Sequence, residues 1–229
     1  MLSDPQSATL ADQAFVCVDL EAGEGPLLAL ARSLGEPIPS RTGNPLVSEL
    51  KPATVESEEV DTFSSKFGLG GFPFHTDTAH WPLPVRFLIL RSVGTSHDRP
   101  TLLIKGQKLL DSIRSSNLTR AVWKSTGPRG TFLCTLYSRL EDEQLFRFDP
   151  LCMKPMNAAA TDVTKAVKAA VVEPVAIDWS LGKTVVIDNW RVLHARATAH
   201  LDDSQTRCLQ RVLVFGRNRL PLFSNALAT

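Results

Sequence analysis

Two side chains that can bind a metal ion, His75 and Asp77, lie one residue apart in the segment Phe74-His75-Thr76-Asp77. In an extended segment, side chains two residues apart point to the same face, so the imidazole and the carboxylate can reach one point in space. Such a pair suits iron, manganese or zinc. Because His-x-Asp is common by chance, the pair indicates a metal site only if a third ligand and a co-substrate site exist elsewhere.

A candidate third ligand, His194, follows a predicted strand in the stretch that begins Asp188-Asn189-Trp190-Arg191. A lone histidine at this place would more often be structural, but His75 and Asp77 require such a partner to complete a facial triad. Two imidazoles and one carboxylate on one face of Fe(II) leave the other positions open for a co-substrate and oxygen. The sequence therefore predicts a metal site formed by His75, Asp77 and His194.

A cation for a co-substrate carboxylate is the next requirement. An open iron site needs an electron source, which a chelating 2-oxo acid supplies, and arginine binds the far carboxylate of such an acid through two parallel hydrogen bonds. Arg207 lies thirteen residues after His194, on a predicted strand that a hairpin could return to the metal. Arg211 lies four residues further, on the same predicted face. For an isolated arginine, a surface position remains the alternative.

The elements that must position these residues are predicted from runs and spacings of apolar side chains. Strands are predicted at residues 85–93, 101–104, 131–137, 145–148 (which could pair with 131–137), 183–188, 192–196 and 207–215. Helices are predicted within 19–37, with an apolar stripe at Leu27 to Leu34 before Gly35, and at 109–114 and 158–172. Residues 51–67 are expected to be irregular and 115–130 to form a long surface connection. Many short strands with interleaved helices favour a mainly β sandwich or barrel with helical insertions.

Other candidate side chains have a structural alternative of equal or greater weight. His80 and Trp81 could line a substrate pocket or pack behind it, and Trp190 is expected in the core. His97 and His200 lie in polar surroundings and are expected to be solvent-exposed.

Length and composition exclude several classes of protein. The 229 residues suit one domain, 1–229, and 43% hydrophobic with 21% charged residues is ordinary for a globular chain. A formal net charge of +1 gives no reason to expect nucleic acid or a membrane as partner. The four cysteines form no Cys-x-x-Cys pair, and residues 1–6 do not resemble a signal peptide, which favours a cytoplasmic protein with free thiols.

Together these motifs resemble the TauD/TfdA-type (clavaminate-synthase-like) family of Fe(II)/2-oxoglutarate-dependent dioxygenases, and the stretch around His194 is especially similar to members related to γ-butyrobetaine hydroxylase. The resemblance covers about residues 70–216 and implies a double-stranded β-helix, a cupin-like jelly roll with flanking helices. It implies that His75, Asp77 and His194 bind Fe(II). It also implies that Thr101 and Arg207 bind the distal carboxylate of 2-oxoglutarate, whereas Arg211 contacts an anionic group of the substrate or co-substrate.

The activity that the resemblance implies is oxidation of an unactivated C–H bond of a small molecule, with O2 as second co-substrate and release of succinate and CO2. Hydroxylation is favoured because family halogenases replace the carboxylate ligand, here Asp77, by a small residue. Desaturation, epoxidation and cyclisation remain alternatives. Arg211 favours an anionic substrate such as an amino acid, and a natural-product biosynthetic intermediate is also compatible. The competing hypotheses are a Mn or Zn enzyme on a similar barrel and a non-catalytic small-molecule-binding barrel.

Overall fold

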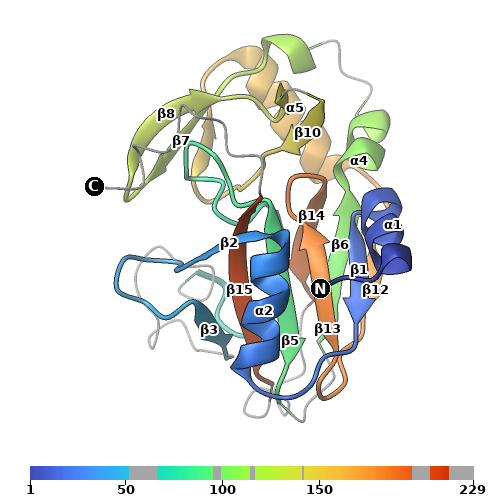
Figure 1. The fold of residues 1–229 in the computed structure, drawn as a ribbon. Helices are drawn as coiled ribbons and strands as arrows, with labels where there is room; N and C mark the ends of the chain where they lie inside the picture. Colours follow the sequence, from blue (N-terminus) through green and yellow to red (C-terminus); the bar gives the residue numbers. More distant parts are fainter. Residues whose placement is uncertain (52–65, 95–98, 114–116, 141, 198–206, 217–229) are drawn as a thin grey trace.

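The computed structural model describes residues 1–51, 66–94, 99–113, 117–140, 142–197 and 207–216 (Figure 1). Within them the protein is mainly β, and two antiparallel sheets form its centre. The larger sheet has six strands: β1 (Phe15–Val18), β13 (Thr184–Asp188), β5 (Phe87–Ser92), β15 (Leu209–Gly216), β2 (Gly35–Ile38) and β3 (Val47–Leu50). The smaller sheet has four: β12 (Val175–Ile177), β6 (Thr101–Lys105), β14 (Val192–Arg196) and β4 (Phe72–His75).

The two sheets share a hydrophobic core because their strands alternate inward and outward side chains. In β13, Val185 and Ile187 belong to the cluster that also contains Leu103 of β6 and Val192 of β14, whereas Val186 points to the opposite face. This period of two is the signature of a strand buried between layers. Two sheets packed through one core, as in a jelly roll, agree with the predicted double-stranded β-helix.

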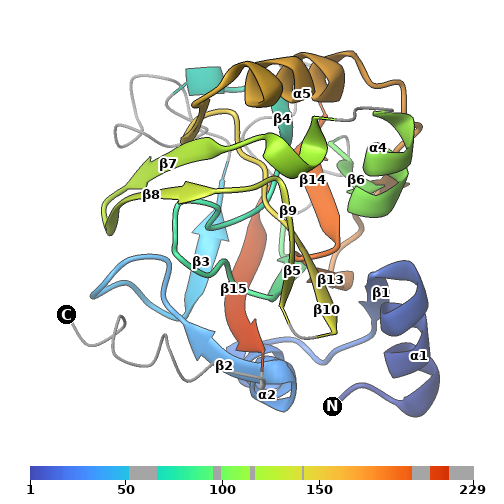
Figure 2. The ribbon, with the colours of Figure 1, turned by 90° about the horizontal axis from the view of Figure 1, so that it is seen from above.

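Helices cover the outer faces of both sheets, and α2 (Glu24–Leu34) and α5 (Ala158–Ala169) lie at opposite ends of the view in Figure 2. α1 (Asp4–Gln13) and α2 cover the larger sheet, and α2 buries Leu27, Leu30 and Ala31 there. α4 (Gly106–Ser112) and α5 lie over the smaller sheet, where Val163 of α5 shares a cluster with Leu193 of β14. None of the helices in the described part of the chain has the length and apolar character that crossing a bilayer requires.

Two short sheets extend from this centre. β7 (Trp123–Gly127) pairs with β8 (Gly130–Cys134) and β11 (Met153–Pro155), and β9 (Tyr137–Leu140) pairs with β10 (Glu143–Phe146). The prediction that 115–130 is only a connection is therefore wrong, since it holds a 3-10 turn (Leu118–Arg120) and β7. The single strand predicted at 131–137 is two strands with different partners, because the chain turns at Thr135, whose hydroxyl donates to the Tyr137 carbonyl.

Candidate metal centre and co-substrate pocket

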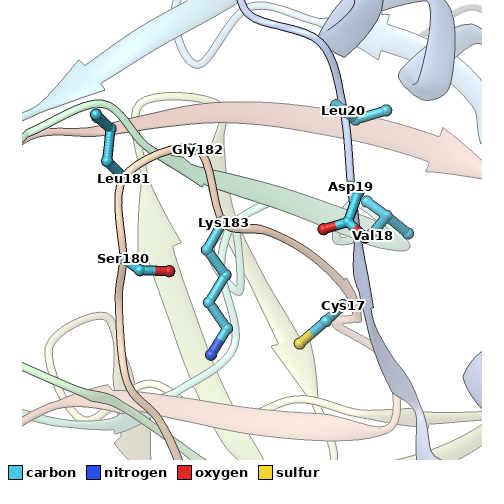
Figure 3. A pocket seen from close by; sticks show the side chains of 8 residues that line it. All are labelled: Cys17, Val18, Asp19, Leu20, Ser180, Leu181, Gly182 and Lys183. Carbon is cyan, nitrogen blue, oxygen red and sulfur yellow. The ribbon is translucent and has the colours of Figure 1, made fainter.

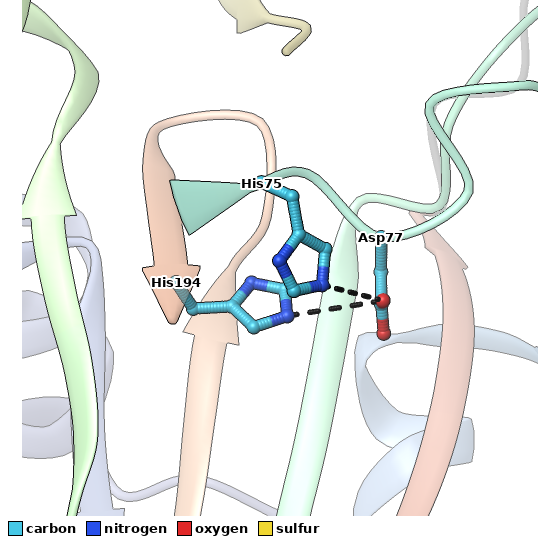
Figure 4. A group of neighbouring side chains, drawn as sticks. All are labelled: His75, Asp77 and His194. Atoms are coloured by element: carbon cyan, nitrogen blue, oxygen red, sulfur yellow. Dashed lines mark ion pairs between the residues drawn. The ribbon is translucent and has the colours of Figure 1, made fainter. Parts of the chain in front are cut away.

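The two candidate histidine ligands are neighbours across one pair of strands. His75 ends β4, and in the ladder it lies directly opposite His194 of β14. Their ring centroids are 4.3 Å apart, and both side chains are buried. Asp77 follows two residues after the end of β4 and turns its carboxylate toward both rings (Figure 4). The sheet register therefore brings together residues that are about 120 positions apart in sequence.

The three side chains converge on one point in space. Oδ1 of Asp77 lies 3.6 Å from Nε2 of His75 and 3.8 Å from Nε2 of His194, and one ligand atom from each residue lies within 4.8 Å of the others. These separations exceed hydrogen-bond lengths. Nδ1 of His75 lies 2.9 Å from the Pro73 carbonyl, to which it donates, so Nε2 keeps its lone pair for the shared space.

Burial and charges around the triad favour the metal-binding forms of Asp77 and His194 but not that of His75. Burial opposes ionisation of Asp77, but Arg211, with Nη1 3.3 Å from Oδ2, and the two imidazoles hold the pKa of this carboxyl well below its usual range. Burial and the neighbouring His75 lower the pKa of His194 to about 3, so its ring is neutral at neutral pH. For His75, burial is outweighed by the Asp77 carboxylate, which raises the pKa, so a proton competes with a metal for this ring.

The donor set fits a divalent transition metal. Two imidazoles and one carboxylate form the facial triad of non-haem iron sites, with other positions left open. Among the described residues, this is the one group of three or more histidine, cysteine or acidic side chains with ligand atoms this close together. The predicted triad is thus assembled by the fold.

Next to the triad, three buried arginines form a second group, the arginine cluster (Arg99, Arg196 and Arg207). Burial and the charge of Arg99 lower the pKa of Arg207 to about 10, and burial with Arg99 and Arg207 does the same for Arg196. The Arg207 side chain is 7% exposed, and its Nε has no hydrogen-bond partner within the described ranges. A buried cation without such a partner is unfavourable unless an anionic ligand reaches it.

Thr101 belongs to the same region through the sheet register. It begins β6, opposite Arg196 of β14, and its buried Oγ1 accepts a hydrogen bond from Nε1 of Trp179 at 3.1 Å. Accepting this bond leaves the hydroxyl hydrogen of Thr101 free to donate to an anion. Thr101 is therefore a neighbour of Arg196, whose pKa is in turn lowered by burial, by Arg99 and by Arg207.

Arg196 also fixes the glycine-rich segment that precedes β4. Its Nη2 donates to the carbonyls of Gly68, at 2.5 Å, and of Gly70, and its guanidinium stacks on the Phe72 ring at 3.6 Å. Gly68 has φ +50°, a left-handed conformation that favours glycine. The segment 68–72 is thus tied to β14, the strand that carries His194.

One part of the predicted geometry is wrong. Arg207 was expected on the strand after His194, which a hairpin could return beside the metal. Arg207 instead lies just before β15, and β15 pairs with β5, β2 and β3 in the larger sheet, whereas β14 belongs to the smaller sheet. The metal site therefore lies where the two sheets face each other: the histidines come from one sheet, and Arg211 comes from β15 of the other. Runs of apolar residues predict strands but do not tell which sheet a strand joins.

The other side chains that the sequence analysis considered lie in the core, pack near the site or fall outside the described residues. Trp190 is buried, as predicted, and donates from Nε1 to the Pro84 carbonyl at 3.0 Å. His80 packs closely against Gly127 of β7 and edge-on to Trp81, which supports the packing alternative for it. His97 and His200 lie outside the described residues.

A surface hollow lies apart from the triad and the arginine cluster (Figure 3). It is lined by Cys17, Val18, Asp19, Leu20, Ser180, Leu181, Gly182 and Lys183. The Lys183 amine donates to the Asp178 carbonyl at 2.6 Å, and the Cys17 thiol is exposed. Because no residue of the hollow belongs to the metal centre, we assign it no role in the chemistry.

Sequence reasoning missed Asn189, Arg196 and Trp179, although the first two stand inside the motif around His194. A signal was available for Arg196, because an arginine two residues beyond a ligand on one strand points to the same face as that ligand. The hydrogen bond from Trp179 to Thr101 joins residues 78 positions apart, and no local sequence pattern predicts it.

Comparisons with known proteins relate the fold of this chain to solved structures of oxygenases. No family model matches the sequence, and no curated protein matches it. Among solved structures, the chain is similar to an asparagine oxygenase in complex with Fe(II), 2S,3S-3-hydroxyasparagine and succinate (TM-score 0.72, 16% identity, 92% of this chain and 78% of that chain). It is also similar to the non-heme iron oxygenase OrfP in complex with Fe, succinate and (3S)-hydroxy-L-Arg (TM-score 0.69, 19% identity, 92% of this chain and 79% of that chain). A third similar structure is that of a taurine dioxygenase from Burkholderia xenovorans (TM-score 0.71, 16% identity, 94% of this chain and 83% of that chain). The chain therefore has the fold of the TauD/TfdA-type iron oxygenases, with a His75-Asp77-His194 triad at its centre.

Proposed function

We propose that this protein is an Fe(II)- and 2-oxoglutarate-dependent oxygenase that hydroxylates an unactivated C–H bond of a small molecule. The observation that carries the proposal is the convergence of His75, Asp77 and His194, together with the buried Arg207, whose Nε has no hydrogen-bond partner among the described residues. A metal triad alone would suit several enzymes. A triad combined with a buried cation suits a dicarboxylate co-substrate, because one end of the molecule can chelate the metal while the other end binds the cation.

In this proposal the chain supplies binding and orientation. His75, Asp77 and His194 hold iron, and Arg211 keeps the Asp77 carboxylate ionised. Iron and 2-oxoglutarate, when bound, supply the activation of O2. Burial of both imidazoles excludes water from the side of the centre that faces the sheet.

The arginine cluster provides the recognition of the co-substrate. Arg207 forms the ion pair with the distal carboxylate, and the Thr101 hydroxyl donates a hydrogen bond to it. Such charge-assisted hydrogen bonds are stronger than neutral ones, above all in a buried pocket. Without the co-substrate, burial and the charge of Arg99 disfavour the charged form of Arg207. A bound carboxylate stabilises this charged form.

The substrate is proposed to be a small anionic molecule, such as an amino acid or a related biosynthetic intermediate. Arg211 lies beside the metal ligand Asp77 and keeps 21% of its side chain exposed, so it can contact a further anion. Two of the similar structures contain hydroxylated amino acids, which agrees with this class. Desaturation, epoxidation and cyclisation are the alternative outcomes of the same oxidation.

Anaerobic absorption spectroscopy tests the proposed function. Adding Fe(II) and 2-oxoglutarate to the protein should give a visible charge-transfer band, which should disappear in Asp77→Ala. Asp162→Ala is the control for the same substitution, because Asp162 lies on α5, accepts a hydrogen bond from the Asn117 amide at 3.3 Å and is not in the triad. A folded, iron-loaded protein that shows no band would refute the proposal.

Screening for succinate release tests the substrate class. Amino acids, other small acids and neutral analogues of each would be offered with Fe(II), 2-oxoglutarate and O2. The proposal expects release to be triggered by acids only. Triggering by neutral compounds and never by acids would show that Arg211 has another role.

A further inference from the structure

The backbone of Asp77 is not held by the sheet that holds His75. β4 ends at His75, so Asp77 lies two residues beyond the last ladder position. The next residue, Thr78, has φ +58°, a conformation that non-glycine residues adopt rarely. Contacts outside the sheet must therefore fix the direction of the Asp77 carboxylate.

Arg211 contacts the carboxylate itself at 3.3 Å, and the Thr78 hydroxyl donates to the Asp77 carbonyl at 2.6 Å. The side-chain amide of Asn189 holds both peptide groups of Asp77. Its Oδ1 accepts a hydrogen bond from the Asp77 N–H at 2.9 Å, and its Nδ2 donates to the Asp77 carbonyl at 3.0 Å. Nδ2 also donates to the Val85 carbonyl at 2.8 Å. One amide group thus takes the place of a missing neighbouring strand for the peptide groups of Asp77.

The orientation of this amide is fixed by its partners. Asn189 is completely buried, and both hydrogens of Nδ2 are used. A flipped amide would place Nδ2 against the Asp77 N–H and Oδ1 against two carbonyl oxygens, which leaves buried groups unsatisfied. The Asn189 backbone is itself anchored, since its N–H donates to the Arg86 carbonyl at 2.7 Å.

Asn189 also connects two of the three ligands. It lies in the turn between β13 and β14, five residues before His194. The same short segment therefore carries one ligand and holds the backbone of another that is 112 positions away in sequence. We propose that Asn189 is a positioning residue of the metal centre, which sets the geometry of Asp77 relative to His194. This inference rests on the proposed function, because it assumes that the triad binds a metal.

Two substitutions remove different parts of the contact. Asn189→Asp keeps the shape and the acceptor for the Asp77 N–H but loses the Nδ2 donors, so a carboxylate oxygen faces the carbonyls of Asp77 and Val85. Asn189→Ser shortens the side chain and removes the bridge while leaving a polar group. Because residues that orient metal ligands typically contribute about 10- to 100-fold to metal affinity, both variants should bind metal about that much more weakly.

The test is calorimetric titration with Co(II), with the absorption bands of the bound ion as a second readout. Leu30→Ala, on α2 at the outer face of the larger sheet, controls for lost stability and should keep wild-type affinity. Asn157→Asp repeats the substitution where Nδ2 donates to the Arg120 carbonyl, at the start of α5, and should also bind Co(II) normally.

The outcomes separate the inference from the function on which it rests. Affinity that falls in both Asn189 variants, with changed absorption bands, at a stability loss no larger than that of Leu30→Ala supports the inference. Wild-type affinity in both Asn189 variants would overturn it, and so would a loss shared by Leu30→Ala. If wild type and His194→Ala bind Co(II) equally, the proposed metal site and the inference both fail.

Discussion

Replacing Arg207 by methionine is expected to stabilise the co-substrate-free protein while strongly weakening its affinity for 2-oxoglutarate. Arg207 is buried, its Nε has no hydrogen-bond partner among the described residues, and its pKa is lowered to about 10 by burial and by Arg99. Folding therefore places a cation in an unfavourable position. Methionine has a similar length and no charge, so it removes this cost.

The size of both effects follows from the structure. A pKa lowered from 12.5 to about 10 corresponds to about 3 kcal/mol at 1.36 kcal/mol per unit, which we take as the upper limit. The free energy of unfolding should then rise by about 1–3 kcal/mol, and at about 2–4 °C per kcal/mol the melting temperature should rise by several degrees. Loss of one partner of a buried charge pair costs about 2–5 kcal/mol, so 2-oxoglutarate should bind about thirtyfold more weakly or worse.

Arg147→Met is the matched control for this experiment. Arg147 is as buried as Arg207, but its guanidinium donates to the carbonyls of Ala79, Trp81 and Pro82 at 2.5–2.8 Å. Its removal leaves these carbonyls without their donor, so this variant should be destabilised.

Urea unfolding without co-substrate and calorimetric titration of the Mn(II)-loaded protein with 2-oxoglutarate measure the two effects. If Arg207→Met is destabilised as much as Arg147→Met, or if it binds 2-oxoglutarate as well as wild type, the reasoning about Arg207 is refuted.

Three further predictions follow from neighbouring contacts. Trp179→Phe removes the hydrogen bond to Thr101, so calorimetry should show 2-oxoglutarate binding weakened by about 0.5–1.5 kcal/mol, and unchanged affinity would contradict this. Arg211→Gln should lose succinate release triggered by anionic substrates while its 2-oxoglutarate affinity stays within a few-fold of wild type; a reversed pattern would assign Arg211 to the co-substrate. Burial raises the pKa of Asp188 to about 6, above the usual 3.8, so the folded protein binds the proton more tightly than the unfolded chain. The stability of wild type relative to Asp188→Asn should therefore fall as pH rises from about 4 to about 6, by at most about 3 kcal/mol in urea unfolding, and a rise over this range would contradict the assignment.

The triad could be predicted from the sequence because its chemistry is local. His75 and Asp77 share a face at a spacing of two, and His194 follows the apolar run at 183–188, which predicts a strand. Similar runs correctly predicted the strands at 85–93 and 183–188, and the stripe at Leu27 to Leu34 correctly predicted α2. Strong local patterns that agree with burial were therefore sufficient for the centre of the fold.

Other elements could not be predicted because long-range pairing decides them. β7 has the sequence Trp-Lys-Ser-Thr-Gly, which lacks an apolar alternation, and it is a strand because β8 and β11 pair with it. No strand was predicted before residue 70, although β1, β2 and β3 belong to the larger sheet. α1 did have a local signal that was overlooked, the capping box formed by Ser3 and Gln6.

The contacts that organise the site were hidden for the same reason. The Asn189 amide forms hydrogen bonds with the peptide groups of Asp77, and Arg196 donates hydrogen bonds to the carbonyls of Gly68 and Gly70. Each of these bonds joins residues more than 100 positions apart in sequence. Such bonds depend on register and on which sheet each strand joins. A single sequence contains the donors and acceptors but does not state their pairing.

A crystal structure of the protein with Mn(II) and N-oxalylglycine would test the central claim most directly. We predict that Mn(II) is bound by Nε2 of His75, a carboxylate oxygen of Asp77 and Nε2 of His194. We further predict that the distal carboxylate of N-oxalylglycine contacts the Arg207 guanidinium and the Thr101 hydroxyl. A metal ion bound elsewhere, or an inhibitor carboxylate that does not reach Arg207, would contradict this account.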